Sequence, residues 1–177
     1  MYNDRGNGYN SRPGGFNRPG GFNRDDRNRA SSHTITAEPL PEDYVKRAEE
    51  AIAELERIEN QDKRKVVITT SKLRSLFSLF TETFNEVTRG DQKKLDKDQL
   101  NDLNVARVRI YYEIGREDRY NGYMDSAPVG RFVQQSGLLA YLGDIGDSCD
   151  KLKQFYHYME ALVAFHRYYF GEKKDRS

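Results

Sequence analysis

The spacing of the apolar residues after residue 40 limits the fold of this 177-residue chain more than any other feature of its sequence. In the clearest stretch, apolar side chains follow one another at intervals of three, one, three, four and three positions. A period near 3.6 places such side chains along one side of an α-helix. The helix is expected to start at the capping residues Thr69, Thr70 and Ser71 and to end at Gly90. The apolar positions are Leu73, Leu76, Phe77, Phe80, Phe84 and Val87.

Four other segments show the same helical spacing. Strand patterns are poor, because the one candidate, residues 66–69, is short and has no partner run. Helices joined by short loops are typical of an all-α fold. The sequence therefore predicts an all-α, single bundle of about five helices, the other four covering residues 44–59, 95–120, 129–145 and 151–170.

The first 40 residues have a different composition. The six-residue unit in RPGGFNRPGGFNR, residues 12–24, occurs twice, and the first 30 residues contain six arginines and three aspartates. Such a Gly-, Asn- and Arg-rich segment has too little apolar surface to offset the entropy of ordering. We therefore expect a disordered tail over residues 1–40 and a helical bundle domain over residues 41–177. The tail could add loose, salt-sensitive contacts to nucleic acid, or it could be inert.

Several classes of protein are disfavoured by composition. No apolar run approaches the roughly 20 residues that span a bilayer, and the N-terminus has no apolar signal region. The single cysteine, Cys149, rules out an internal disulfide framework and a multi-cysteine metal site. We expect a cytoplasmic protein with no membrane partner.

Catalytic patterns are weak. His157 and Glu160 are three apart on one predicted helix, and three aspartates, at 144, 147 and 150, precede it. An enzyme would need these groups to converge in one pocket, whereas capping acids and solvated helix residues explain the same pattern. The sequence therefore predicts a protein that is not an enzyme and carries no metal or cofactor.

Basic residues are better placed for binding. The net charge is only +1, yet Lys63, Arg64 and Lys65 form a run, and Lys72 and Arg74 follow at the start of a helix. Cations oppose the helix dipole there, while free backbone N–H groups and hydroxyls favour a phosphate. A solvated charge run is the alternative interpretation.

The predicted helix over residues 95–120 carries more arginines. Arg109 and Arg116 are seven apart, hence on one face, and Arg119 follows three later. Acidic residues between them could pair with some of these arginines. The chain also has 12 tyrosines, several of which we expect at an interface rather than in the core.

Three segments, read in order, resemble a known family. They are Ile68-Thr-Thr-Ser-Lys-Leu-Arg74, Tyr111-Tyr-Glu-Ile-Gly-Arg116 and the helix from Phe155 to Arg167 with its Met-Glu-Ala-Leu-Val-Ala core. The likeness covers about residues 44–171 and is to the small α-helical subunit of the type III-A CRISPR interference complex, the Csm complex.

The resemblance implies a non-catalytic role in antiviral defence. It implies copies of the subunit that stack into a filament, contact other subunits, and hold crRNA and target RNA by sequence-independent backbone contacts. It assigns RNA binding to Lys72, Arg74 and Arg116. Electrostatics alone adds six weaker candidates: Lys63, Arg64, Lys65, Arg109, Arg119 and Arg131.

The sequence leaves a second function open. A helical protein–protein adaptor with no nucleic-acid role would have an exposed apolar or tyrosine patch. Its basic residues would be scattered or paired with acids.

Overall fold

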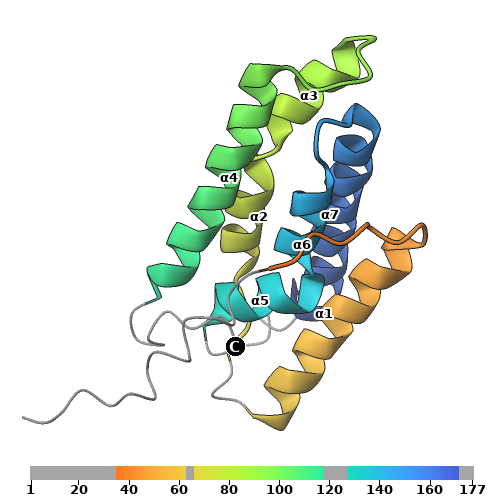
Figure 1. Ribbon diagram of the computed structural model, residues 1–177. Coiled ribbons are helices and arrows are strands. Elements are labelled where there is room, and N and C mark those ends of the chain that lie inside the picture. Colours follow the sequence, from red (N-terminus) through yellow and green to blue (C-terminus); the bar gives the residue numbers. More distant parts are fainter. Residues whose placement is uncertain (1–34, 63–65, 118–126, 172–177) are drawn as a thin grey trace, which may run out of the picture. The chain divides into compact units, whose positions relative to one another are not determined.

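The computed structural model describes residues 35–62, 66–117 and 127–171, which all lie in one compact unit, Ile35–Ser177. The described residues form helices and no strand beyond one isolated bridge between Lys94 and Ser148 (Figure 1). The predicted all-α fold is confirmed. In chain order the helices are α1 Tyr44–Gln61, α2 Thr70–Ser78, α3 Thr81–Arg89, α4 Lys97–Gly115, α5 Pro128–Ser136, α6 Leu138–Asp144 and α7 Cys149–Phe170.

Helix α7 is the centre of the packing. It contacts α1, α2, α3 and α6, while α5 packs against α1, α4 and α6. Its apolar side is fully buried at Leu152, Met159 and Leu162, as the spacing predicts. Tyr158 is also fully buried, because its hydroxyl donates to the carbonyl oxygen of Ser136 at 2.5 Å and so satisfies its polar end.

The predicted helix over residues 70–89 is two helices, α2 and α3. The amides of Leu79 and Phe80 bond to the carbonyls three residues earlier, at 3.3 and 3.1 Å, which tightens the chain into a turn. The turn points Phe80 at Phe155, with ring centroids 5.0 Å apart. The continuous apolar spacing conceals this break, since both helices bury their apolar side against α7.

The predicted helix over residues 129–145 is also divided. Gly137 ends α5 with φ 66°, a left-handed conformation that costs other residues roughly 1–2 kcal/mol. A Cβ atom at this position would lie 3.0 Å from the ring of Tyr141. Both the backbone conformation and the closeness of Tyr141 therefore favour glycine at position 137. The bend at this glycine separates α5 from α6.

Helix α4 is shorter than predicted. Asp96 caps it through the backbone amides of Asp98 and Gln99, and the Gln99 side chain accepts from the Asp96 amide. This capping box starts the helix at Lys97 rather than Leu95, and it ends at Gly115. Its buried side faces the bundle, at Leu103, Ala106, Ile110 and Ile114.

Part of the predicted tail is packed. The amide of Glu38 donates to the carbonyl of Ala140 at 3.1 Å, and Ile35 and Leu40 pack against the core. Gly143 allows the close approach, because a Cβ atom there would lie 3.2 Å from Ala37. Residues 35–40 thus belong to the bundle, whereas residues 1–34 lie outside the described part.

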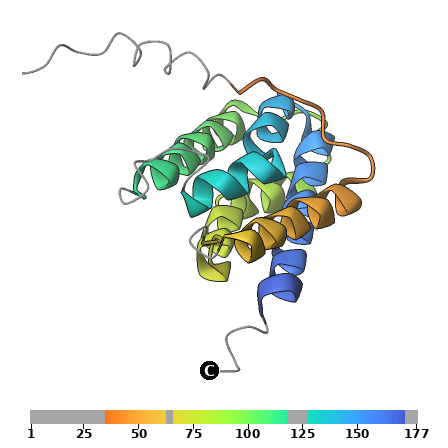
Figure 2. The ribbon, with the colours of Figure 1, turned by 90° about the horizontal axis from the view of Figure 1, so that it is seen from below.

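Helices α4 and α1 lie at opposite sides of the bundle. Figures 1 and 2 show them on different sides of α5 from two directions, with α1 beside α7 and α4 beside α2 and α3. None of the helices in the described residues combines the length and apolarity that a membrane span needs.

Candidate nucleic-acid interface

The start of α2 is built as the sequence predicts. Thr69 is the N-cap, and its hydroxyl accepts from the backbone amide of Lys72 at 3.2 Å. No acidic residue lies in the first turn of α2. No acidic side chain in this turn therefore neutralises the positive end of the helix dipole, and Lys72 lies beside it.

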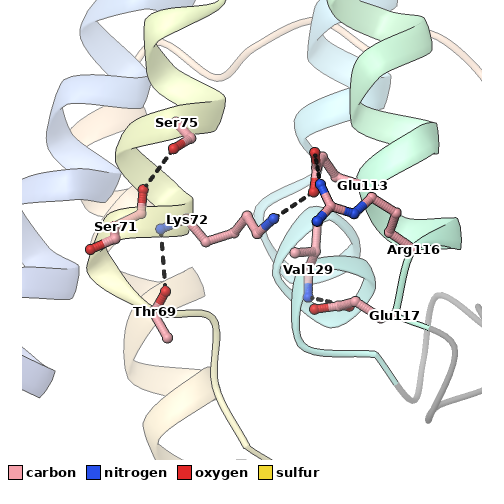
Figure 3. A network of polar contacts seen from close by, with 8 residues as sticks. All are labelled: Thr69, Ser71, Lys72, Ser75, Glu113, Arg116, Glu117 and Val129. Atoms are coloured by element: carbon pink, nitrogen blue, oxygen red, sulfur yellow. Dashed lines mark hydrogen bonds and ion pairs between the residues drawn. The ribbon is translucent and has the colours of Figure 1, made fainter.

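Lys72 reaches across to α4 and meets Glu113 there (Figure 3). Its ammonium lies 2.5 Å from one carboxylate oxygen, and Arg116 lies 3.3 Å from the other. Two cations thus share one carboxylate. The hydrogen bond from Lys72 is the main cause that lowers the pKa of Glu113, so this carboxyl stays ionised at neutral pH.

A groove of about 380 Å³ runs between α2 and α4 beside this network. It contains a further cation, Arg109, and hydroxyl groups from α2. Among the described residues that line it, Glu113 is the only acid. The lining residues are Lys72, Ser75, Leu76, Ser78, Leu79, Arg109, Tyr112 and Glu113.

The cations in and beside the groove are open to a ligand from solvent. The Arg116 side chain is 59% exposed and lies over the ring of Tyr112, 5.9 Å from its centroid. Lys72 remains 34% exposed although it is paired. With Arg109, three cations and one carboxylate give this region a net charge of about +2 at neutral pH.

The other predicted RNA contacts are distributed differently. Arg74 is exposed on α2 but does not line the groove, because two residues along a helix correspond to about 200°. The run 63–65 and Arg119 lie outside the described residues.

Arg131 has a structural position instead. It is 5% exposed, and its guanidinium donates to the carbonyl oxygen of Val66 at 2.9 Å. A guanidinium in this position is not available to a phosphate backbone. The contact of Arg131 with RNA stays a prediction, and its burial, which the sequence does not show, disfavours it.

His166 holds the same segment from α7. Its Nε2 lies 2.7 Å from the carbonyl oxygen of Ile68, which can only accept, so Nε2 carries the proton. Nδ1 then accepts from the Thr70 hydroxyl at 3.4 Å. Arg131 and His166 therefore fix two alternate carbonyls, those of Val66 and Ile68, just before α2 and the groove.

The groups considered for catalysis do not converge. His157 pairs with Glu160 at 2.8 Å on the exposed side of α7. Lys151 pairs with Asp144 at 2.9 Å, on the α6–α7 connection. No group of three His, Cys, Asp or Glu residues that could hold a metal occurs within the described ranges.

The remaining groups considered in the sequence have structural surroundings. Lys94 pairs with Asp147 at 2.7 Å. Cys149 is buried, and burial raises the pKa of its thiol, which disfavours the reactive thiolate.

Sequence reasoning did not assign three groove residues to the RNA site: Ser78, Tyr112, which it expected only at an interface, and Glu113, which it expected only to pair with arginines. Tyr112 is four residues before Arg116, and this spacing could have indicated their shared face. The contact between Lys72 and Glu113 joins residues 41 apart in the chain, and no local pattern indicates it.

The amino-acid sequence was compared with protein families and with known proteins, and relatives were found. The family model described as Csm2 Type III-A matches residues 41–172. A "CRISPR system Cms protein Csm2" from Mycobacterium tuberculosis is 36% identical over 129 residues, covering 73% of this chain and 93% of that protein. The protein of the same name from Streptococcus thermophilus is 34% identical over 131 residues, covering 74% and 94%. The one from Enterococcus italicus is 28% identical over 131 residues, covering 69% and 86%.

Proposed function

Because this chain belongs to the Csm2 type III-A family, we propose that it is a non-catalytic, RNA-binding subunit of a type III-A CRISPR effector complex. Several copies would lie side by side in the cytoplasm along paired crRNA and target RNA and hold the sugar-phosphate chain without reading its sequence. Other subunits of the complex would be its further partners.

The observation that carries this proposal is the groove between α2 and α4. Lys72 and Arg109 line it from different helices, and Arg116 joins it through Glu113. A phosphate chain is bound by positive charge and by shape, with base pairing between the two RNAs supplying the sequence recognition. A groove with hydroxyls and a small net positive charge fits this requirement.

The carboxylate in the groove limits the strength of the contact. Glu113 cancels part of the charge of Lys72 and Arg116, so one copy would bind weakly. A row of copies adds such weak contacts along one strand. This fits a subunit whose whole chain has a net charge of +1.

The test is the salt dependence of RNA binding by the full chain. We expect the double change Lys72→Ala and Arg109→Ala, which removes the two cations that line the groove, to weaken binding of single-stranded and duplex RNA alike, whatever the sequence. The slope of log K against log salt should fall by up to about 2, since each lost phosphate contact removes roughly 0.7–0.9.

A matched control removes two cations elsewhere. Lys46→Ala with Arg57→Ala takes the same charge from exposed positions of α1, where both cations pair with neighbouring glutamates. An equal loss of slope in both double variants would contradict a local RNA contact at the groove between α2 and α4.

A protein–protein role without RNA is the second candidate. It is supported by exposed Val105, Val108, Tyr111 and Tyr112 on α4. An RNA affinity that stays unmeasurable at low salt, in the chain and in its assembled complex, would favour this role over the first.

A further inference from the structure

The lining of the groove between α2 and α4 includes an apolar part that a phosphate chain does not need. Phosphates are bound by cations, hydroxyls and backbone N–H groups. The cations Lys72 and Arg109 and the hydroxyls of α2 meet that need. Leu76 and Leu79 of α2 and Tyr112 of α4 line the same groove. These three side chains indicate that a second, less polar group enters the groove together with the phosphate.

Cations and apolar side chains are close neighbours on both walls of the groove. On α2, Leu76 follows Lys72 by four residues, and on α4, Tyr112 follows Arg109 by three. Such intervals correspond to about one helical turn, or roughly 5 Å along the helix axis. A ligand whose anionic and apolar parts are covalently joined can therefore contact both kinds of side chain on the same wall.

The ring of Tyr112 is available to this apolar group. Tyr112 is 63% exposed, although the guanidinium of Arg116 lies 5.9 Å from its ring centroid. No other aromatic ring in the described part of the chain packs against it. By contrast, the buried Tyr158 of α7 packs edge to face on Tyr141, with ring centroids 5.5 Å apart. Tyr112 is therefore not a core residue, and its ring remains open to a planar group from solvent.

A nucleobase is the planar group that these surroundings fit. Unpaired bases stack on aromatic side chains while cations hold the neighbouring phosphates. The three cations and one carboxylate of this region leave a net charge of about +2 at neutral pH, which favours a ligand with a phosphate over an uncharged protein side chain. Every base has a π-face, so stacking tolerates any sequence. It is therefore compatible with a subunit that does not read sequence.

We propose that the groove between α2 and α4 takes one unpaired nucleotide of RNA, with its base stacked on Tyr112 and its phosphate on Lys72 and Arg109. The groove volume of about 380 Å³ lies at the lower end of the range for small-ligand sites, about 300–1,000 Å³. The inference rests on the proposed function in that RNA reaches this groove. It adds that the base contributes to the affinity wherever pairing is absent, because a base inside a duplex is stacked on both faces.

A probe without bases tests the stacking directly. Two probes of equal length and charge are used, a single-stranded RNA and a ribose-phosphate chain that carries no bases. Tyr112→Ala removes the ring and leaves the charge of the full chain unchanged. At about 50 mM salt, its dissociation constant for the intact RNA should rise at least about fivefold, the lower end of what stacking of one base on an aromatic side chain contributes. For the probe without bases it should stay at the wild-type value.

Two further variants are the controls. Tyr112→Phe keeps the ring and should retain the wild-type affinity for both probes. Tyr111 is the next tyrosine of α4, is 43% exposed and does not line the groove, so Tyr111→Ala should also bind like the wild type. Both positions are exposed, so we expect all three variants to fold, with thermal unfolding as the check.

Three outcomes would overturn the proposal. They are an unchanged affinity of Tyr112→Ala for the intact RNA, an equal loss of affinity for the probe without bases, and an equal loss in Tyr111→Ala. Full RNA affinity of Tyr112→Ala together with its loss from the assembled effector complex would assign the ring to a protein partner instead.

Failure of the proposed function gives a different pattern. Lys72→Ala with Arg109→Ala would then leave the salt slope of both probes unchanged. If that slope falls while Tyr112→Ala binds the intact RNA like the wild type, the phosphate contact stands and only the base is excluded from the groove. Binding of the intact RNA too weak to measure would contradict the inference and the proposed function together.

Discussion

Replacing Glu113 by glutamine tests whether the groove between α2 and α4 faces a phosphate chain. The carboxylate accepts from Lys72 at 2.5 Å and lies 3.3 Å from Arg116, so a phosphate held by Lys72 would be about 6 Å from it. At that separation two like charges repel by about 0.7 kcal/mol in water. Glu113→Gln removes the repulsion and raises the net charge of the groove region from about +2 to about +3.

The expected result is tighter RNA binding. A change of about 0.7 kcal/mol corresponds to about threefold in the dissociation constant. The gain should be largest at about 20 mM salt and should nearly vanish at about 500 mM, where the Debye length falls below the distance involved. Fluorescence anisotropy of a labelled single-stranded RNA, titrated with the full chain across this salt range, measures the effect.

The same change should lower the stability of the free chain. Lys72 and Glu113 are 34% and 22% exposed, and the loss of such a pair costs about 1 kcal/mol or less. Pairing lowers the pKa of Glu113 below its ordinary 4.5, so its stabilisation is present above that value and is lost as pH falls through the folded-state pKa. The stability difference between the two chains should therefore disappear in acid, while tighter RNA binding accompanies lower stability at neutral pH.

Asp102→Asn is the matched control. It changes the net charge by the same amount at an exposed position of α4, 11 residues from Glu113, or roughly 16 Å along the helix. The two variants are therefore compared at physiological salt, where that distance is about two Debye lengths. Equal gains in affinity in the two variants, or a loss in Glu113→Gln, would refute the placement of RNA in this groove.

Three further predictions concern the bundle and the first part of the chain. Burial lowers the pKa of His166 below its ordinary 6.5, so the unfolded chain takes up a proton first and stability should fall as pH drops through about 6.5 towards the folded-state pKa. In urea unfolding, the free energy of unfolding of His166→Gln should fall less over this pH range than that of the wild type. An equal fall in both chains would contradict the assignment of the pH dependence to His166. Gly137→Ala should cost at least about 1–2 kcal/mol from its φ of 66° and the contact with Tyr141, whereas Gly90→Ala, with φ −95° and no close contact, should cost little. Deleting residues 1–33 should reduce RNA affinity at low salt if the arginines there contact RNA, and an unchanged affinity would show that they do not.

The helical segments could be predicted because their determinants are local. Apolar spacing located α1, α4 and α7 to within a few residues, and the Thr69 cap follows from residue type alone. The division at Gly137 also has a local signal, since glycine adopts positive φ readily. These features depend on residues that are neighbours along the chain.

The break between α2 and α3 and the charge pairs depend on tertiary contacts. Phe80 has the correct spacing for a continuous helix, and only its packing against Phe155 explains the turn. Arg131 resembles any other cation in the sequence, and its contact with Val66 is 65 residues distant. Charge can be counted from a sequence, but its availability to a ligand is set by burial and by partners that the fold brings together.

The periodicity of helix α4 separates its buried side from the side that lines the groove. Positions 103, 106, 110 and 114 face the core, 109, 112 and 113 line the groove with α2, and 101, 104, 108, 111 and 115 face solvent without charge. Several copies side by side, as proposed above, would repeat the groove between α2 and α4 along one strand. Each groove needs only a small net positive charge, because contacts along one strand multiply their equilibrium constants. A chain with net charge +1 can therefore hold a phosphate backbone as a row when a single copy holds it weakly.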